Sequence, residues 1–88
     1  MSTSEAFVIT GTSDLFSGVH ALNIHGGLHP VGGKSYGRIS PEGVAAMRRF
    51  FKSEAEAQAE IDRLHARAAE HHTTSAWTFT VQPAAAVA

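Results

Sequence analysis

The sequence predicts a small α+β domain, in which an antiparallel sheet of four to five strands carries one long α-helix on one face. Residues 53–72 have the composition and start signals of a helix. Residues 76–82 alternate apolar and polar side chains, as a half-buried strand does, and we expect this strand beside the one before the helix or in the middle of the sheet. The 88 residues make a single domain (1–88), whose residues 1–5 and 83–88 we expect to be frayed tails.

The segment from Ser53 to His72 carries the strongest helix signals. Ser53 and Glu56 form a capping box, in which the serine side chain accepts from the Glu56 amide and the glutamate accepts from the Ser53 amide. Acidic residues lie in its first half and basic residues in its second half, which suits the helix dipole. The stripe that we expect to face the sheet consists of Ala57, Ile61, Leu64 and Ala68.

Shorter β-rich segments occupy the first half of the chain. Residues 6–10 and 19–24 are the first two predicted strands, and residues 34–40 are a third. A turn or small loop is expected at 11–18, and a loop or a wide hairpin connection at 25–33, which holds four of the eight glycines.

Residues 41–51 allow two interpretations, helix or strand. Ser40 followed by Pro41 is a helix-start signal, because proline suits the first helical position. The run Met47–Phe51, directly before Ser53, is instead typical of a strand that leads into the long helix. We favour the strand.

Composition excludes several classes of protein. The chain has no cysteine, so disulfides and thiol chemistry are excluded. Its start lacks the basic and apolar regions of a signal peptide, and no apolar run approaches the roughly 20 residues of a membrane span. We therefore expect a cytoplasmic protein. Its richness in Ala, Gly, Arg and His is typical of a bacterial or phage gene.

Catalytic motifs are missing as well. Gly33-Lys34-Ser35 resembles the end of a phosphate-binding loop, but the first glycine of that motif falls on Leu28. The sequence contains neither a nucleophile elbow nor an HExxH pair. We expect no enzyme activity and no cofactor.

Six histidines raise the question of a metal site: His20, His25, His29, His65, His71 and His72. A zinc site needs three or four fixed ligands. His25 and His29 flank two glycines, and His71 and His72 are neighbours at a helix end, so their rings point in different directions. We expect no metal site, with a histidine-based metal-binding protein as an alternative.

The charge layout points to a binding surface. Five of the seven cations fall between residues 34 and 52, interleaved with aromatic residues, although the net charge of the chain is −1. Leu15 and Phe16 lie in a predicted loop, where they either fold back onto the core or form an exposed contact. The predicted partner-binding residues are Phe16, Tyr36, Arg38, Arg48, Arg49 and Lys52.

These observations favour a non-enzymatic interaction module that binds a protein partner, such as a regulator or inhibitor encoded by a bacterium, a phage or a mobile element. A nucleic-acid-binding domain that uses segment 34–52 is the alternative. A homodimer is compatible with either function. The sequence leaves one question open, which is whether Glu54 and Glu56 neutralise the neighbouring cations.

Overall fold

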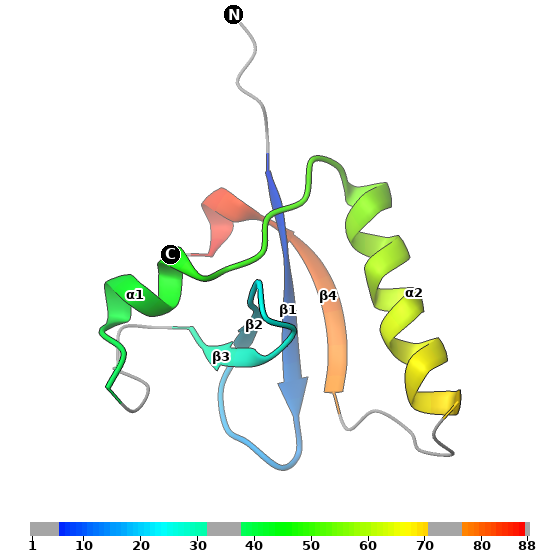
Figure 1. Cartoon of the computed structure of the whole chain (residues 1–88), viewed down its shortest axis with the longest axis horizontal. Coiled ribbons are helices and arrows are strands. Elements are labelled where there is room, and N and C mark those ends of the chain that lie inside the picture. The colour runs from blue at the N-terminus through cyan, green and yellow to red at the C-terminus, as the bar shows by residue number, and fades with distance from the viewer. Residues whose placement is uncertain (1–5, 32–37, 71–76, 88) are drawn as a thin grey trace, which may run out of the picture.

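The computed structural model describes residues 6–31, 38–70 and 77–87. These residues form a four-stranded antiparallel sheet with strand order β3-β2-β1-β4, and in Figure 1 α1 lies toward the β3 end of this order and α2 toward the β4 end. The elements in chain order are β1 (Phe7–Ser13), β2 (His20–Leu22), β3 (Leu28–Pro30), α1 (Pro41–Ala46), α2 (Glu54–Glu70), β4 (Trp77–Pro83) and a short 3-10 turn, η1 (Ala84–Ala86). The predicted α+β class, long helix and C-terminal strand are confirmed.

β1 is the strand on which the sheet is built. It pairs with β4 along its whole length, from Phe7 opposite Pro83 to Ser13 opposite Trp77, and with the shorter β2 at two positions. β4 therefore lies at the edge of the sheet beside β1. The expectation that this strand lies in the middle of the sheet, or beside the strand before the long helix, is wrong.

β3 lies inside the segment that the sequence predicts to be a loop or a wide hairpin connection, so that prediction is wrong for Leu28–Pro30. Gly26 adopts a positive φ of 85°, which glycine accepts without a steric penalty, and this tight turn brings β3 back against β2. Of the predicted strand at 34–40, residues 34–37 lie outside the described residues, and Ser40 is the N-cap of α1.

Both interpretations of residues 41–51 hold in part. The Ser40 hydroxyl accepts from the Gly43 amide (3.1 Å) and starts α1, which ends at Ala46. Strand-like bonding follows at once, because the Met47 carbonyl accepts from the Ile24 amide at 2.7 Å. The favoured strand interpretation therefore fits only the run Met47–Phe51, which bridges to Asn23 and Phe7, whereas Pro41–Ala46 is helical.

Segment 47–51 fits between the start of β1 and the end of β2. The amide and carbonyl groups of Phe51 exchange hydrogen bonds with those of Phe7 (2.8 and 2.9 Å). The Arg49 amide donates to the Leu22 carbonyl at 3.0 Å. The start of β1 and the end of β2 do not pair with each other here. Segment 47–51 lies between them and bonds to both before the chain enters α2.

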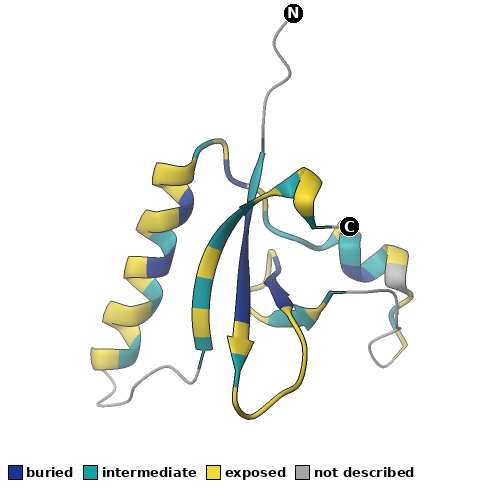
Figure 2. Cartoon of the chain, turned by 180° about the vertical axis from the view of Figure 1, so that it is seen from behind, coloured by how far each residue is buried: buried dark blue, intermediate teal, exposed yellow. Residues whose placement is uncertain are grey.

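The hydrophobic core lies between α2 and the sheet. Its buried members are Ile9, Leu22, Phe51, Ala57 and Ile61. Figure 2 shows that α2 buries one stripe and exposes the rest of its surface. Of the predicted stripe, Ala57 and Ile61 are buried. Leu64 and Ala68 are half-buried, so the stripe is confirmed.

The start of α2 follows the predicted capping box with one difference. The Ser53 hydroxyl accepts from the Glu56 amide at 3.1 Å, as expected. The Glu56 carboxylate accepts from the amide of Lys52 (3.2 Å), one residue before the predicted donor. It therefore holds the incoming chain against the first turn of the helix.

The residues after β4 make contacts of their own. The Ala84 amide donates to the Ala6 carbonyl (2.8 Å), and the Val87 carbonyl accepts from the Arg48 guanidinium (3.1 Å). Residues 84–87, for which the sequence predicts a frayed tail, thus form η1 and a link to segment 47–51. Residues 1–5 of the other predicted tail lie outside the described residues.

Candidate protein-interaction surface

The two arginines of the predicted basic segment point in different directions. The Arg48 guanidinium reaches the Val87 carbonyl after η1. The Arg49 guanidinium lies 3.4 Å from the Glu60 carboxylate of α2 and 5.0 Å from the centre of the Phe51 ring. Neighbouring residues of an extended chain point to opposite faces. The segment between α1 and α2 therefore directs Arg48 and Arg49 to opposite sides.

The other predicted binding residues are distributed more widely. Arg38 and Lys52 are exposed. Tyr36 lies outside the described residues. Phe16 lies in loop 14–19, which follows β1 at the end remote from Phe51 (Figure 1). The structure therefore does not bring Phe16 together with Arg48 and Arg49.

The acidic partner of the basic segment is Glu60. Its carboxylate accepts from the guanidinium of Arg63 (Nε at 2.9 Å) and faces that of Arg49. The hydrogen bond from Arg63, with the charges of both arginines, holds the pKa of Glu60 below its ordinary value. Glu56, by contrast, is engaged with a backbone amide. The sequence left open whether Glu54 and Glu56 neutralise the neighbouring cations. Of these cations, Arg49 is paired with Glu60, two turns into α2.

Aromatic and aliphatic side chains gather at the other end of β1, where His20 is buried, Trp77 is half-buried and the loop residues are exposed. The rings of Phe16 and Trp77 stack with centroids 5.7 Å apart and an interplanar angle of 6°. The His20 ring meets Trp77 edge-on at 4.9 Å. Phe16 nevertheless stays 56% exposed, and its neighbour Leu15 is 73% exposed. We refer to Leu15, Phe16, His20 and Trp77 as the aromatic end.

Leu15 and Phe16 both stay exposed and outside the core, so of the two expectations for this loop the exposed contact is the one that fits. Phe16 stacks on Trp77, whereas Leu15 projects into solvent. Gly11 makes the stack feasible, because a Cβ atom at this position would lie 3.2 Å from Trp77 Cε3. The absence of a side chain on β1 thus lets Trp77 lie close against the strand.

Sequence reasoning missed Trp77 as part of this surface. A signal was present, because strict alternation places Trp77, Phe79 and Val81 on one face of β4. The stripe of α2 contains only two large side chains, Ile61 and Leu64, which is too little to cover three such residues. Trp77 is accordingly covered by the loop that carries Phe16.

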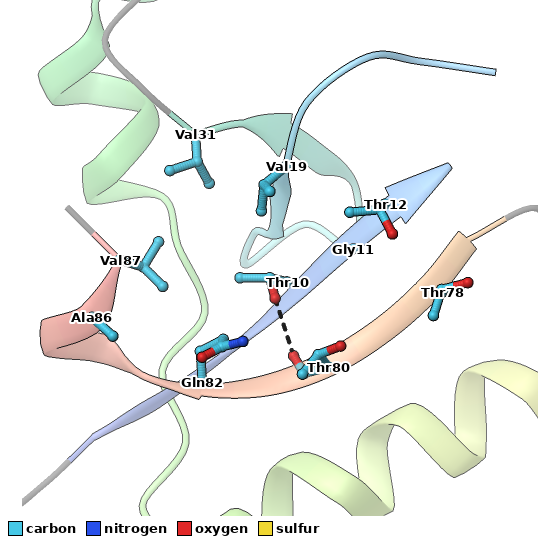
Figure 3. A pocket seen from close by; sticks show the side chains of 10 residues that line it. All are labelled: Thr10, Gly11, Thr12, Val19, Val31, Thr78, Thr80, Gln82, Ala86 and Val87. Atoms are coloured by element: carbon cyan, nitrogen blue, oxygen red, sulfur yellow. Dashed lines mark hydrogen bonds between the residues drawn. The ribbon is translucent and has the colours of Figure 1, made fainter. Parts of the chain in front are cut away.

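The sheet face away from α2 carries an open hollow of about 550 Å³ (Figure 3). Its lining residues are Thr10, Gly11, Thr12, Val19, Val31, Thr78, Thr80, Gln82, Ala86 and Val87. The Thr10 hydroxyl donates to the Thr80 carbonyl at 3.3 Å. The lining offers methyl groups, hydroxyls and one amide, but no ionisable side chain, so its chemistry is that of contact rather than proton transfer.

The histidines of the first half of the chain differ in their surroundings: two are held by hydrogen-bonding neighbours, and one is exposed. His20 lies 3.3 Å from the Gly18 carbonyl, and His29 lies 3.2 Å from the amide of Asn23. His25 is exposed. Among residues 6–31, 38–70 and 77–87, no group of three metal-ligating side chains comes together. His71 and His72 lie outside these ranges, so the metal-binding alternative stays a prediction.

Comparison of the chain with protein-family models, curated proteins and solved structures found no match. Within the described part of the chain, no helix has the length and apolar character needed to cross a membrane.

Proposed function

We propose that the chain is a non-enzymatic interaction module that binds a protein partner, with the aromatic end as its contact surface. The observation that supports this proposal is the exposure of Leu15 and Phe16. Burial of a large apolar side chain is worth about 1.5–3 kcal/mol, and at this end of β1 the domain leaves two neighbouring ones, Leu15 and Phe16, outside its core. A partner that covered them would recover that free energy.

The residue types at the aromatic end suit this role. Aromatic side chains are enriched in the centres of protein interfaces, because they bury much area with few rotatable bonds. Phe16 is already held by its stack on Trp77, so it loses little freedom when a partner covers it. Among the predicted binding residues we therefore expect Phe16 to be the main anchor.

We favour a protein over a nucleic acid as the partner. The nucleic-acid alternative depends on the cations between residues 34 and 52, and two of them, Arg48 and Arg49, already contact groups of the same chain. A small domain of this kind would act by occupying a surface of its partner, as a cytoplasmic regulator or inhibitor of bacterial or phage origin.

A capture experiment in lysate of the native host tests the proposal. The chain is biotinylated at its N-terminus, and wild type is compared with the double variant Leu15→Ser/Phe16→Ser. The matched control is Ala59→Ser/Ala66→Ser, two exposed positions on α2. Thermal melts establish that all three proteins are folded.

We expect a host protein that wild type and the control enrich and that the double variant loses. Purified, it should bind wild type at least tenfold more tightly than the double variant, which corresponds to about 1.4 kcal/mol. An identical set of proteins captured by the double variant, or no specific protein captured by wild type, would contradict the proposal.

A further inference from the structure

β4 is an edge strand that shows few of the usual protections. It pairs with β1 over seven residues, and no strand lies on its other side in the part of the chain that the structure describes. Natural edge strands are commonly short, bulged or marked with charges that discourage further pairing. The β4 sequence WTFTVQP has no charged residue, and its one protective residue is Pro83 at the end.

The register against β1 decides which backbone groups of β4 face outward. The Ala84 amide donates to the Ala6 carbonyl, and this pair continues the register of the ladder. Hydrogen-bonded and non-hydrogen-bonded pairs alternate in an antiparallel ladder. Thr80 therefore directs its amide and carbonyl to β1, whereas those of its neighbours Phe79 and Val81 point away from β1.

A groove of about 580 Å³ lies between β4 and the first turns of α2. It is lined by Phe79, Thr80 and Val81 of β4 and by Glu54, Ala55 and Gln58 of α2. The outward backbone groups of β4 therefore lie beside an open channel rather than beneath a closed helix contact.

The flank of α2 along this groove is acidic. Glu54 lines the groove, and Asp62, one turn beyond Gln58, accepts a hydrogen bond from the Gln58 amide at 3.1 Å. The cation Arg63 pairs with Glu60 on the other flank of the helix. Glu54 thus faces the groove, Asp62 lies further along the same flank of α2, and the described residues place no lysine or arginine on that flank.

We propose that β4 accepts an extended, basic segment of a protein partner as an additional strand. An extended peptide offers donors and acceptors at the two-residue spacing of Phe79 and Val81. The peptide side chains opposite these two residues lie on the α2 face, where lysine or arginine meets Glu54 and Asp62. The expected sequence motif of the bound peptide is basic-x-basic. The inference rests on the proposed protein-binding function.

A second copy of the chain fits this edge less well. Antiparallel pairing of two β4 strands about a two-fold axis keeps both α2 helices on the same side of the joined sheet. The acidic flanks with Glu54 and Asp62 would then face each other, and like charges at such an interface oppose binding. A basic peptide reverses the sign of this interaction.

The test uses the full chain, labelled with ¹⁵N, and the blocked peptide acetyl-Thr-Lys-Val-Arg-Val-Thr-amide. We expect the peptide to slow hydrogen exchange of the Phe79 and Val81 amides about tenfold. The Thr80 amide should change little, because its hydrogen bond to β1 exists already. The matched peptide has glutamate in place of lysine and arginine, and we expect it to give no protection.

A pair of variants tests the role of the edge directly. Val81→Pro removes an outward amide without removing a bond to β1, and Val81→Ala removes similar side-chain bulk but keeps the amide. Val81→Pro should bind the basic peptide about tenfold more weakly than Val81→Ala. Replacement of Glu54 by Gln and of Asp62 by Asn should remove the preference for the basic peptide.

Equal binding by the two Val81 variants, or equal binding of the two peptides, would overturn the inference. Protection of Phe79 and Val81 that rises with protein concentration in the absence of peptide would overturn it in favour of a second copy. The capture experiment tests the proposed function separately. If Val81→Pro retains a host partner that Leu15→Ser/Phe16→Ser loses, the edge inference alone fails, whereas capture of no partner refutes the function itself.

Discussion

Substitution of Asn23 by alanine tests how the turn between β2 and β3 is held. The Asn23 side chain is almost fully buried, with 3% of the residue exposed. Its Oδ1 atom accepts from the amides of His25 (2.8 Å) and Gly27 (3.0 Å). Backbone amides can only donate, so Oδ1 faces the turn and Nδ2 faces His29 Nε2 at 3.2 Å.

The expected loss follows from these three contacts. A hydrogen bond contributes about 0.5–1.5 kcal/mol to stability, and a buried polar group left without a partner costs about 1–3 kcal/mol. His25 and Gly27 are exposed, so water replaces part of what their amides lose. We therefore expect Asn23→Ala to lower the free energy of unfolding by about 2 kcal/mol, which is about 10 °C in Tm for a domain of this size.

Urea and thermal denaturation at pH 7 measure the effect. Asn23→Asp is the matched control, because it keeps the accepting oxygen for both amides, while it puts a second carboxylate oxygen and a negative charge beside His29. We expect it to lose less than half as much stability as Asn23→Ala. A change below about 0.5 kcal/mol for Asn23→Ala would refute the reasoning, as would equal losses in the two variants.

Two further predictions concern α2 and β1. The pKa of Glu60 is lowered in the fold, so its charged form stabilises the protein above the pKa of the unfolded chain, and this contribution disappears as the pH falls through the lowered value. Glu60→Gln should therefore cost about 0.5–1 kcal/mol at neutral pH and nothing in acid, which urea denaturation across pH will show; a cost independent of pH would contradict this. Gly11→Val should cost about 1–3 kcal/mol and alter the fluorescence of Trp77, because the new Cβ lies 3.2 Å from its ring. Unchanged emission and stability would rule out the close approach.

The sequence was most informative where a pattern is local. The stripe of α2 and the alternation of β4 follow from the periods of helix and strand, which a short window reveals. β3 has only three residues, and it is a strand because the Asn23 turn pairs it with β2. No window of sequence around Leu28–Pro30 contains that information.

The candidate surface was less predictable for the same reason. Arg48 and Arg49 look like free cations in the sequence, because their partners Val87 and Glu60 lie 39 and 11 positions away. Phe16 was identifiable as an apolar residue in a polar loop. Trp77 was identifiable as an inward-facing residue of β4 but not as the platform of Phe16, because the stack joins residues from opposite ends of the described chain.

The pairing of β1 with β4 also has a consequence for the order of folding. Thr10 and Thr80, which bond across this ladder, are 70 positions apart. Contacts at such separation form late, because loop closure must precede them. α2, rich in alanine and well capped, needs no such closure and is expected to acquire helical structure first. During synthesis the edge of β1 that pairs with β4 therefore stays unpaired until the residues of β4 have been made. In that interval this edge can pair with a wrong strand.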